Sequence, residues 1–548
     1  MVLVPAERIQ AYRQAGWWGD TTLWSLFAAQ VAAQPDAEAV VDAPNRASFA
    51  PGAPQRWSWA RLHHEVQAFG ALLLQAGLQR DQVIVVQLPN TVEQFMVYLA
   101  CARLGIIVSP VPVAYREHEL TQILAQTEAA ALVTFEHIGR HAAGAMARSL
   151  SPRVITLDAP RPAGAIPDAW PLPTADEVFT ICWTSGTEAQ PKGVPRSHNE
   201  WLIVAPSIIE AAGLAPGARL LNPFPLVNMA GLSTAFSAWL TLGGTVVQHH
   251  PFALPVFLQQ LREERIDYTV APPAVLTQLL QNEALLAGID FQRLARIGSG
   301  SAPLSDWMVR GFAERHGVQI VNYYGSNEGA ALSGGVHDMP DPALRAVYFP
   351  RSGVAGYDWH VSTTRKIRTR LVDPDTEEDI VVSGVPGELR FTGPTIFSGY
   401  WRAPEQSRRA FDAQGFYRTG DLFEIGGERQ QYYRYVGRLK DLVIRGGMNI
   451  SSEEIENLLQ GCPGVREAAV VGVPDAVLGE RVCACIVAAE GAEPTLAEIT
   501  QYLREQRRIA VYKLPEALLR LPALPRNPVG KILKRELRTL ARSEAVAA

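Results

Sequence analysis

The chain has 548 residues, of which 47% are hydrophobic and 19% charged, and it carries a formal net charge of −5. This composition is typical of a globular protein with more than one domain, and the slight acidity gives no basic surface that would indicate a nucleic-acid partner. No run approaches the roughly 18 apolar residues of a membrane span, and the first residues lack the pattern of a signal peptide. We therefore expect a cytoplasmic protein without a membrane partner.

The first third of the chain predicts alternating helices and strands. Residues 8–35 have helical spacing, and the Pro-, Ala- and Gly-rich residues 43–54 indicate a surface loop. Amphipathic stretches predict two further helices, at residues 62–76 and 92–104. Apolar runs predict two strands, at residues 83–88 and 106–112. This alternation predicts stacked α/β units with largely buried sheets. Residues 158–173 are again rich in Pro and Ala and indicate a linker.

A polar loop follows the buried strand predicted over residues 178–183. It gathers hydroxyls, glycines and one lysine, namely Thr184, Ser185, Gly186, Thr187, Lys192 and Gly193. Hydroxyls donate to phosphate oxygens, glycines let the backbone approach an anion, and lysine adds a point charge. A Walker A loop places its lysine directly after a glycine, whereas Lys192 follows Pro191. The pattern predicts a phosphate loop of another kind or an ordinary polar turn, and Ser197 with Glu200 then predicts a helix start.

Small-residue loops also follow later strands. Residues 222–231 lead into a helix predicted over residues 232–242, and a strand is predicted at residues 245–248. Three further segments each combine an apolar strand with a loop of small residues, at 268–273, 297–303 and 320–328. Ligands of open α/β sheets lie at such carboxyl ends. The glycines, aromatic side chain and carboxylate of these loops suit a base, a ribose and a metal-bound phosphate, although each loop alone is also an ordinary turn.

The last part of the chain predicts a separate small α+β domain. Capping-box spacing at Ser451 and Thr495 indicates two short helices, and residues 468–473 and 482–487 have the alternation of strands. The cysteines of the chain form neither a zinc pattern nor a disulfide framework. We expect reduced core thiols at Cys101, Cys182, Cys462, Cys483 and Cys485.

Four sequence blocks mark the second half: Tyr-Arg-Thr-Gly-Asp (417–421), Tyr-Val-Gly-Arg-Leu-Lys-Asp (435–441), Arg-Gly-Gly-Met-Asn-Ile-Ser-Ser-Glu-Glu-Ile-Glu (445–456) and Pro-Val-Gly-Lys-Ile-Leu-Lys (528–534). With the loop at 184–193 they make five blocks in register over nearly the whole chain. The chain thereby resembles the adenylate-forming superfamily of acyl- and aryl-CoA ligases, peptide-synthetase adenylation domains and luciferases. The resemblance implies an α/β fold, with a large N-terminal domain of stacked α/β sheets (1–439), a small mobile α+β C-terminal domain (440–548) and a hinge at Lys440.

The resemblance implies an ATP site in the strand-end loops. Ser185, Thr187 and Lys192 would hold the β- and γ-phosphates. Tyr324 would stack on adenine, and Asn322 would bind its amino edge. Further nucleotide contacts are implied for Thr184, Gly186, Gly300, Ser301, Ala302, Tyr323, Gly325 and Ser326.

The resemblance also assigns charged groups to the reaction. Glu328 would bind Mg²⁺, a hard cation that prefers carboxylate and phosphate oxygens. Asp421 would accept both ribose hydroxyls, with support from Arg438. Lys531 would bridge the substrate carboxylate and the α-phosphate and neutralise their charge. Without the surrounding motif, Lys531 would be interpreted as a surface lysine.

The implied reaction has two halves. The carboxylate of an acid attacks the α-phosphorus of ATP, releases pyrophosphate and leaves an acyl adenylate, which a thiol then attacks. In the family, the C-terminal domain rotates about the hinge between the two halves and brings a glycine strand to a pantetheine tunnel. Here Arg445, Gly446 and Gly447 would line that tunnel. The expected cofactors are therefore ATP, Mg²⁺ and coenzyme A.

The chain departs from the family pattern at three places. Glu188 and Ala189 replace the usual Thr-Gly of the phosphate loop, which puts a carboxylate near phosphates. Asn327 replaces the usual threonine before Glu328, so that an amide, which can also donate, stands in place of the hydroxyl partner of the nucleotide. Asn228 stands where many members carry a histidine or an aromatic residue that gates the acid pocket.

The acid pocket is predicted to be small and apolar, lined by Asn228, Met229, Gly231, Gly298 and Ser299. Residues 12–18 and 195–199 resemble stand-alone aryl-acid adenylating enzymes of siderophore assembly. Those enzymes have His-Asn where this chain has Asn228 and Met229, so we do not expect a dihydroxybenzoate substrate. No group is placed to bind an α-amino group, and we expect a hydrophobic aromatic, alicyclic or medium-chain acid.

Three functions remain open from the sequence. The first is a CoA ligase, favoured by residues 445–447 and by the absence of a fused carrier domain. The second is a stand-alone adenylation enzyme that loads a carrier protein in trans. The third is a non-catalytic binding protein with the same fold, which the complete set of charged motif residues argues against. A monomer and a homodimer are both compatible with the sequence.

Overall fold

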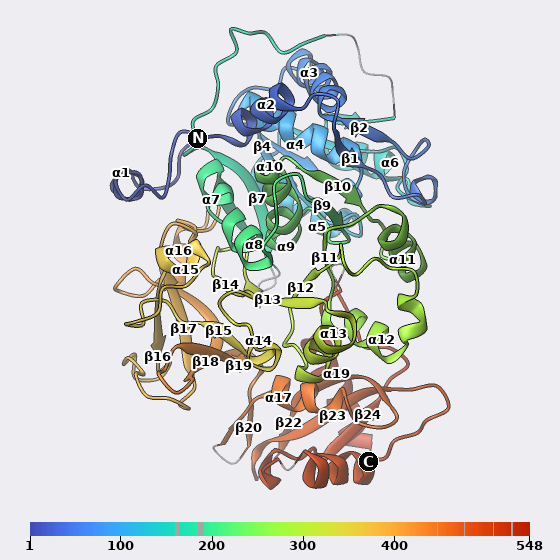
Figure 1. Ribbon diagram of the computed structural model, residues 1–548, viewed down its shortest axis with the longest axis vertical. Coiled ribbons are helices and arrows are strands. Elements are labelled where there is room, and N and C mark those ends of the chain that lie inside the picture. Colours follow the sequence, from blue (N-terminus) through green and yellow to red (C-terminus); the bar gives the residue numbers. More distant parts are fainter. Residues whose placement is uncertain are drawn as a thin grey trace. The chain divides into compact units, whose positions relative to one another are not determined.

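The structure of the chain is a computed structural model (Figure 1), and it describes residues 1–158, 164–184, 191–445, 448–475, 477–507, 509–527 and 530–547. Two compact units share these residues. Unit 1 comprises Met1–Ala302, Asp306–Arg368 and Phe391–Tyr417, and unit 2 comprises Pro303–Ser305, Thr369–Arg390 and Arg418–Ala548. Both mix helices with sheets, which confirms the predicted fold class. The predicted domain boundary at Lys440 lies inside unit 2 and stays a prediction.

One sheet of unit 1 has six strands in the order β6-β5-β3-β4-β7-β8. The strands are β3 (Val83–Val86), β4 (Ile107–Pro110), β5 (Ala131–Thr134), β6 (Val154–Thr156), β7 (Val178–Thr184) and β8 (Lys192–Ser197). All neighbours are parallel except β7 and β8, which pair antiparallel. Strand β8 was not predicted from the sequence, because its conformation depends on backbone pairing with β7. The helix itself begins where predicted, since the Ser197 side chain accepts from Glu200 N in a capping box.

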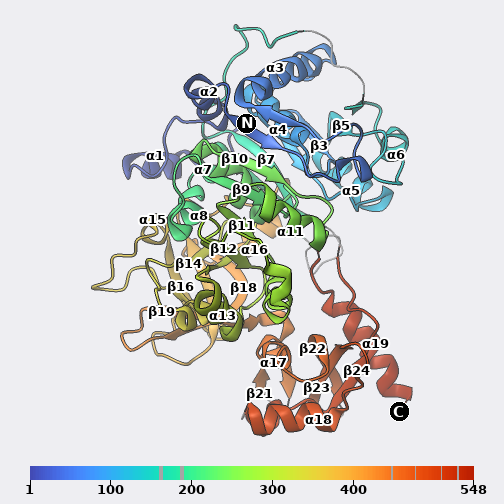
Figure 2. The ribbon, with the colours of Figure 1, turned by 45° about the vertical axis from the view of Figure 1, so that its right-hand side comes forward.

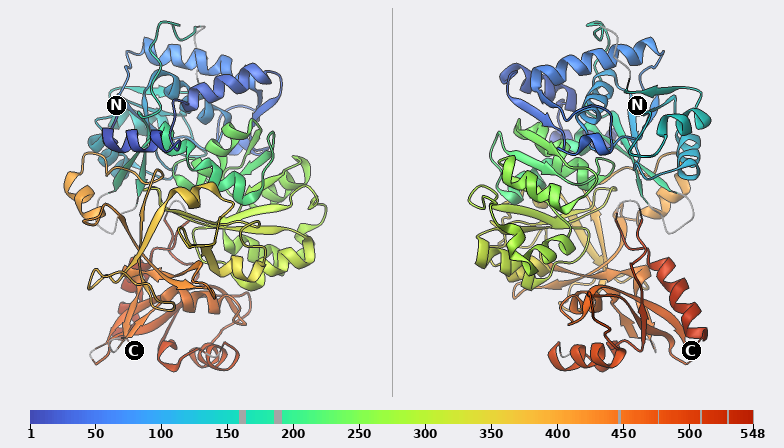
Figure 3. Two further views of the ribbon diagram at one scale, coloured as in Figure 1. Left: turned by 60° about the vertical axis from the view of Figure 1, so that its left-hand side comes forward. Right: turned by 90° about the vertical axis from the view of Figure 1, so that its right-hand side faces the viewer.

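The second sheet of unit 1 has eight strands in the order β14-β13-β12-β11-β9-β10-β1-β2, and its green strands can be followed in Figure 3. The strands are β1 (Glu38–Val41), β2 (Arg56–Ser58), β9 (Arg219–Asn222), β10 (Thr245–Gln248), β11 (Tyr268–Val270), β12 (Arg296–Gly300), β13 (Gln319–Gly325) and β14 (Ala331–Gly334). Strands β13, β12, β11, β9, β10 and β1 are parallel. Their carboxyl ends therefore share one edge, which brings the predicted loops together.

Helices cover the sheets of unit 1 and bury a large aromatic core. They are α1 (Ala6–Gln14), α2 (Leu23–Ala33), α3 (Trp59–Gln75), α4 (Val92–Leu104), α5 (Glu117–Thr127), α6 (Ala143–Leu150), α7 (His198–Leu202), α8 (Ala205–Ala212), α9 (Met229–Gly231), α10 (Ala238–Leu242), α11 (Leu254–Glu263), α12 (Pro273–Gln281), α13 (Asp306–His316), α14 (Pro342–Val347), α15 (Ser362–Lys366) and α16 (Pro404–Ala410). The indoles of Trp59 and Trp239 stack with their centroids 4.7 Å apart. This stack ties α3 to α10.

Two predicted segments of unit 1 differ in detail. The helix predicted over residues 232–242 is a π-helix at Leu232–Ser237 before α10 begins. The hydroxyls of Ser233 and Thr234 donate to carbonyls four residues back, which competes with the helical ladder. The surface loop predicted at residues 43–54 instead buries Arg46, whose guanidinium pairs with Asp42 and Glu93. Composition alone did not reveal that ion pair.

Unit 2 contributes to two sheets. In the first, a five-stranded sheet of order β15-β19-β18-β17-β16, the strands are β15 (Tyr348–Pro350), β16 (Arg368–Val372), β17 (Gly387–Thr392), β18 (Tyr417–Gly426) and β19 (Tyr432–Arg438). The second joins β20 (Val443–Arg445), β21 (Met448–Ile450), β22 (Val465–Asp475), β23 (Gly479–Ala488) and β24 (Ala517–Arg520). Figure 2 shows this sheet with α17 (Ser452–Leu459), α18 (Leu496–Gln501) and α19 (Lys534–Ala547) around it. The helix starts predicted at Ser451 and Thr495 are confirmed, since both side chains cap.

Two expectations from composition can be compared with the described residues. All five cysteines are free and buried, which confirms that they are core thiols. Within the described part of the chain, the longest and most apolar helices still fall short of what a membrane span requires.

Candidate active site

The glycines of strand β12 make room for Tyr323 on the neighbouring strand β13. A Cβ on Gly298 would lie 2.3 Å from the Tyr268 hydroxyl and 2.7 Å from the Tyr323 ring, and one on Gly300 would lie 2.2 Å from the Tyr323 carbonyl oxygen. The two tyrosine hydroxyls are 3.2 Å apart, with Tyr268 donating. Both predicted site glycines are therefore required for the close approach of β12 and β13.

The end of β12 uses its serines in different ways. The Ser299 hydroxyl is buried and donates to the Ala271 carbonyl at 2.8 Å, so this predicted pocket residue holds the β11 loop. Ser301 is exposed and has a φ of 68°, a conformation that residues with a Cβ rarely adopt. Ala302 beside it is also exposed. The exposed turn after β12 is thus strained at Ser301, whereas Ser299 at the end of the strand is held by its hydrogen bond to Ala271.

The end of β13 carries the predicted adenine residues. The Asn322 amide group donates to the carbonyls of Arg345 at 3.1 Å and Ala346 at 3.3 Å. The Tyr324 ring lies nearly parallel to Phe391, at 19° and 6.3 Å between centroids. Gly325 ends β13, and the turn that begins at Ser326 closes when Gly329 N donates to its carbonyl. This turn carries Glu328.

Glu328 is nearly buried, with 6% of its surface exposed. The Tyr400 hydroxyl donates to Oε1 of its carboxylate at 3.0 Å, and Phe397 N donates to its backbone carbonyl at 2.9 Å. The Lys192 ammonium lies 5.3 Å from the centroid of the Tyr400 ring. The structure therefore gathers Glu328 and Lys192, which the sequence predicted, around Tyr400, which it did not.

Tyr400 remains a hydrogen-bond donor at neutral pH. Burial raises its pKa well above the ordinary range, and the nearby Glu328 carboxylate acts in the same direction. Burial and Glu328 also raise the pKa of Tyr417. The sequence signal for Tyr400 was the Gly-Tyr-Trp run at residues 399–401, in which Gly399 has a φ of 145°. Its partner is far away in the sequence, so the contact could not be predicted from spacing.

The donor set around Glu328 fits a Mg²⁺ ion that is shared with a nucleotide. Among the residues that the structure describes, no three His, Cys, Asp or Glu side chains converge on one point. Mg²⁺ is commonly bound by one or two carboxylates together with substrate phosphates, rather than by a full protein cage. A single carboxylate at a strand end matches that mode.

The predicted phosphate loop joins the paired strands β7 and β8. Thr184 pairs with Lys192 across the two strands. A Cβ on Gly193 would lie 2.9 Å from the Ile181 side chain, and Trp401 N donates to the Gly193 carbonyl at 2.8 Å. The predictions for Ser185, Gly186, Thr187, Glu188 and Ala189 lie outside the described residues.

Residues 228–231, here named the acid loop because they carry predicted acid-pocket residues, form a turn that is fixed by local contacts. The Asn228 side chain accepts from Gly231 N at 3.3 Å and caps α9, so its oxygen serves the loop itself. A Cβ on Gly231 would lie 2.2 Å from the Pro225 carbonyl oxygen. Met229 is buried at the first position of α9. These predicted pocket residues therefore share one tight turn.

Unit 2 places the predicted ribose residues opposite each other. Asp421 of β18 pairs in register with Arg438 of β19, and Arg438 Nε lies 3.3 Å from an Asp421 carboxylate oxygen. Lys440 follows in the 3-10 turn Leu439–Asp441. The Arg445 guanidinium makes two contacts with Glu516, at 2.7 and 2.8 Å. Gly446 and Gly447 lie outside the described residues.

Lys531 sits on a turn near other cations. Its backbone N donates to the Asn527 side chain at 2.8 Å, which anchors the turn. Desolvation lowers the pKa of the Lys531 ammonium to about 8, and the charges of Arg438 and Lys440 act in the same direction. The side chain nevertheless keeps exposed surface. An anion bound there would relieve the repulsion among these cations.

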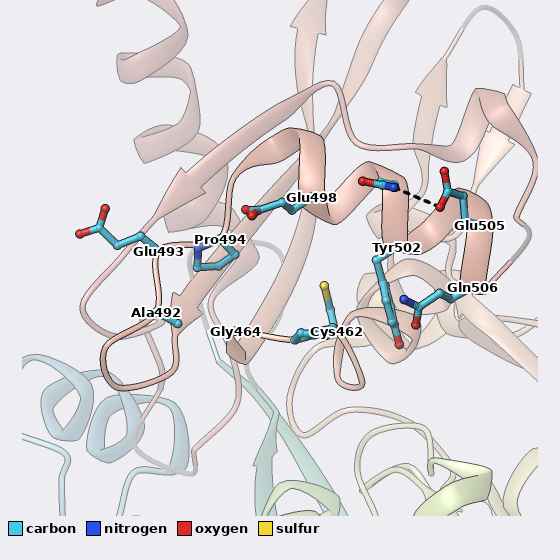
Figure 4. A pocket seen from close by; sticks show the side chains of 11 residues that line it. Cys462, Gly464, Ala492, Glu493, Pro494, Glu498, Tyr502, Glu505 and Gln506 are labelled. Atoms are coloured by element: carbon cyan, nitrogen blue, oxygen red, sulfur yellow. Dashed lines mark hydrogen bonds between the residues drawn. The ribbon is translucent and has the colours of Figure 1, made fainter.

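A hollow of about 480 Å³ on unit 2 contains no predicted site residue (Figure 4). Several of its polar lining groups already have partners. Glu498 accepts from Thr495, Glu505 accepts from Gln501 at 3.1 Å, and the Tyr502 hydroxyl accepts from Arg507 at 2.7 Å. We therefore place the candidate site at the strand ends of unit 1 and not in this hollow.

Comparisons with known proteins agree with this placement. A family model described as AMP-binding enzyme matches residues 27–401, and a model described as AMP-binding enzyme C-terminal domain matches residues 454–531. The first model covers the strand-end loops of unit 1, including Lys192 and Glu328. The second covers Lys531.

Similar proteins match along nearly their whole length. The medium-chain fatty-acid–CoA ligase of Escherichia coli strain K12 is 30% identical over 97% of this chain and 92% of its own length. Pyochelin synthase PchD of Pseudomonas aeruginosa strain UCBPP-PA14 is 30% identical over 99% of this chain and 96% of its own length. The 2-hydroxy-7-methoxy-5-methyl-1-naphthoate–CoA ligase of Streptomyces carzinostaticus is 30% identical over 98% and 96%. The ATP-bound crystal structure of MatB from Rhodopseudomonas palustris matches with a TM-score of 0.78 and 28% identity, covering 95% of this chain and 99% of that chain.

We predict that Ser301→Gly stabilises the protein. Glycine adopts the left-handed conformation without the Cβ clash, which costs other residues about 1 kcal/mol or more. Thermal unfolding should show a higher Tm for Ser301→Gly than for the wild type. Ser301→Ala, which keeps the Cβ and removes the hydroxyl, should give no gain, and an equal gain in that control would contradict the strain argument.

Proposed function

Because the chain belongs to the AMP-binding enzyme family, we propose that it activates a hydrophobic carboxylic acid with ATP and transfers the acyl group to coenzyme A. The observation that carries this proposal is the gathering of Glu328, Tyr400 and Lys192 at the strand ends of unit 1. Binding a triphosphate with its metal requires a carboxylate for the metal and a cation for the phosphates, and here a neutral donor orients the carboxylate.

The first half-reaction forms an acyl adenylate. A carboxylate oxygen of the acid attacks the α-phosphorus, the bond to the β-phosphate bridging oxygen breaks, and pyrophosphate leaves with the electron pair. Lys192 binds the leaving phosphates, and Tyr324 stacks on adenine. The side-chain nitrogen of Asn322 already donates to two backbone carbonyls. The adenine amino group would therefore donate to the side-chain oxygen of Asn322.

Glu328 holds the metal in this proposal, and Tyr400 orients Glu328. When bound, Mg²⁺ offsets the negative charge of the phosphates. The Tyr400 hydroxyl donates to one carboxylate oxygen, which leaves the other oxygen for the metal. Lys531 supplies a positive charge to the acid carboxylate and the α-phosphate, whose mutual repulsion otherwise opposes attack.

The second half-reaction forms a thioester. The thiolate of coenzyme A attacks the acyl carbon, the bond to the adenylate oxygen breaks, and AMP leaves. We propose that Asp421 and Arg438 hold the ribose, that the chain hinges at Lys440, and that residues 445–447 line the path of the thiol arm. Since Glu516 neutralises Arg445, that side chain adds no net charge to the path.

We propose an aromatic, alicyclic or medium-chain acid. Met229 brings an apolar side chain to the acid loop, and Gly298 and Gly300 bring Tyr323 close to β12. The similarity to a medium-chain fatty-acid–CoA ligase and to a naphthoate–CoA ligase supports acids of this class.

A second candidate acceptor is a carrier protein. Pyochelin synthase PchD and Triostin synthetase I are as similar to this chain as the CoA ligases are, at 30% identity. In that case the first half-reaction is unchanged, and the thiol of a carrier's phosphopantetheine replaces that of coenzyme A.

Pyrophosphate release tests the proposal. The purified protein is incubated with MgATP and each of octanoate, benzoate, cyclohexanecarboxylate and 1-naphthoate, with and without coenzyme A. Release that multiplies with coenzyme A and yields an acyl-CoA supports the ligase. A bound adenylate that does not turn over with coenzyme A favours the carrier protein, and no release with any carboxylic acid would contradict acid activation.

Removing one hydroxyl tests the role of Tyr400. Tyr400→Phe keeps the ring beside Lys192 and deletes the donor to Glu328, so we expect about a tenfold loss in kcat/KM for pyrophosphate release and a higher Mg²⁺ requirement. A magnesium titration at fixed ATP measures both. An unchanged magnesium dependence would exclude Tyr400 from orienting the metal carboxylate.

The pH dependence of adenylation tests Lys531. The pKa of Lys531 is lowered to about 8, so its ammonium is charged at neutral pH. The positive charge is lost as the pH rises through that value. We expect kcat/KM for adenylation to fall above pH 8, since this parameter reports the free enzyme. Lys531→Arg should move this fall to higher pH, and Lys531→Ala should remove activity while circular dichroism stays unchanged. Undiminished adenylation in Lys531→Ala would remove the residue from the mechanism.

A further inference from the structure

The side chain of Asn327 joins two segments that are distant in the sequence. Its Oδ1 accepts from the backbone N of Met229 at 2.7 Å, and its Nδ2 donates to the backbone carbonyl of Trp183 at 3.1 Å. The two partners fix the orientation of the amide, because an N–H must meet the oxygen and a carbonyl must meet the nitrogen. Asn327 therefore bridges the acid loop and the end of β7.

The Met229 end of the bridge is the less constrained one. Met229 is the first residue of α9, where the helix offers its N–H no intrahelical partner. The Asn228 side chain satisfies Gly231 N nearby, so the capping residue does not serve Met229. Asn327 thus supplies the acceptor that fixes the start of the acid loop.

The Trp183 end is held by the sheet. Trp183 pairs with Gly193 of β8, and its indole donates to Ser109 at 2.8 Å. The backbone of Asn327 is also fixed, since Arg196 donates to its carbonyl at 3.1 Å. The bridge therefore connects a short loop to a rigid strand that leads into the predicted phosphate loop.

From this geometry we propose that Asn327 is a positioning residue that sets the acid loop at Met229 against strand β7, and thereby the affinity for the acid. A threonine hydroxyl is a single atom, so it cannot occupy both the accepting and the donating position of the amide. The residue that departs from the family pattern therefore makes a contact of its own. The kinetic consequence rests on the proposed acid activation, whereas the contact itself does not.

Hydrogen exchange tests the contact without any substrate. In the full-length protein, the peptide that covers residues 225–232 should lose one protected amide in Asn327→Thr and in Asn327→Ala. Exchange of the Met229 amide should be at least tenfold faster, because its acceptor is gone. Unchanged protection at Met229 would overturn the inference, whatever the activity of the protein.

Steady-state kinetics test the positioning role. With the most active acid of the panel that contains octanoate, benzoate, cyclohexanecarboxylate and 1-naphthoate, we expect Asn327→Thr to raise the KM for the acid about fivefold or more. The KM for MgATP should change less than twofold, because the sheet holds β7 independently. Equal changes in both KM values, or a loss of kcat alone, would show a merely structural residue and overturn the role.

Substitutions at Met229 supply a matched pair of backgrounds. Met229→Pro removes the N–H that Asn327 binds, at a helix position that tolerates proline and after a residue in extended conformation. Met229→Ala removes the side chain and keeps the N–H. Asn327→Thr should raise the acid KM in the Met229→Ala background and add less than twofold in the Met229→Pro background.

The outcomes separate the two proposals. A wild-type protein that releases no pyrophosphate with any acid contradicts the proposed function, while exchange at Met229 still decides the contact. Equal effects of Asn327→Thr in both Met229 backgrounds would show that Asn327 does not act through the Met229 N–H, and would overturn the inference alone.

Discussion

The candidate site of unit 1 depends on one buried guanidinium. Arg196 is fully buried, and its Nη atoms donate to the backbone carbonyls of Asn327 at 3.1 Å, Glu200 at 2.7 Å and Thr395 at 3.1 Å. These carbonyls belong to the turn that carries Glu328, to helix α7 and to the segment that leads to Tyr400. Hydrogen bonds from a charged donor contribute about 1.5–3 kcal/mol each. Arg196 therefore holds together the backbone segments that carry Glu328 and Tyr400.

Close packing around this guanidinium explains the glycine that follows Glu328. Gly329 has a φ of 98°, and a Cβ there would lie 1.8 Å from the Thr395 carbonyl oxygen and 2.7 Å from Arg196 Nη1. Only a residue without a side chain lets the turn approach both groups. Burial lowers the pKa of Arg196, and the nearby carboxyl of Glu200 acts in the opposite direction. Because arginine is not deprotonated in proteins, the guanidinium keeps its charge although carbonyls are its direct partners.

Local signals in the sequence predicted those features that local contacts produce. The helix at residues 92–104, the strand at residues 245–248 and the helix starts at Ser197 and Ser451 agree with the structure, because caps and periodicity act within a few residues. Strand β8 was missed since its pairing with β7 decides its conformation. The role of Tyr400 was missed for the same reason, because its partner Glu328 lies 72 residues away. Glu328 and Lys192 were identified from sequence motifs, which point to functional residues without specifying their contacts.

The charged groups around Lys531 in unit 2 are arranged differently from those around Glu328 in unit 1. Around Glu328 a neutral hydroxyl donates to the carboxylate, whereas the Lys531 ammonium lies within the electrostatic influence of two other cations, Arg438 and Lys440. Desolvation lowers the pKa of Lys531 most, the charges of Arg438 and Lys440 lower it further, and Asp421 and Asp441 only partly oppose these effects. A site with excess positive charge binds a proton less tightly and an anion more tightly, and the two effects are linked. Binding of a phosphate or carboxylate at Lys531 would therefore raise its pKa and favour the charged ammonium.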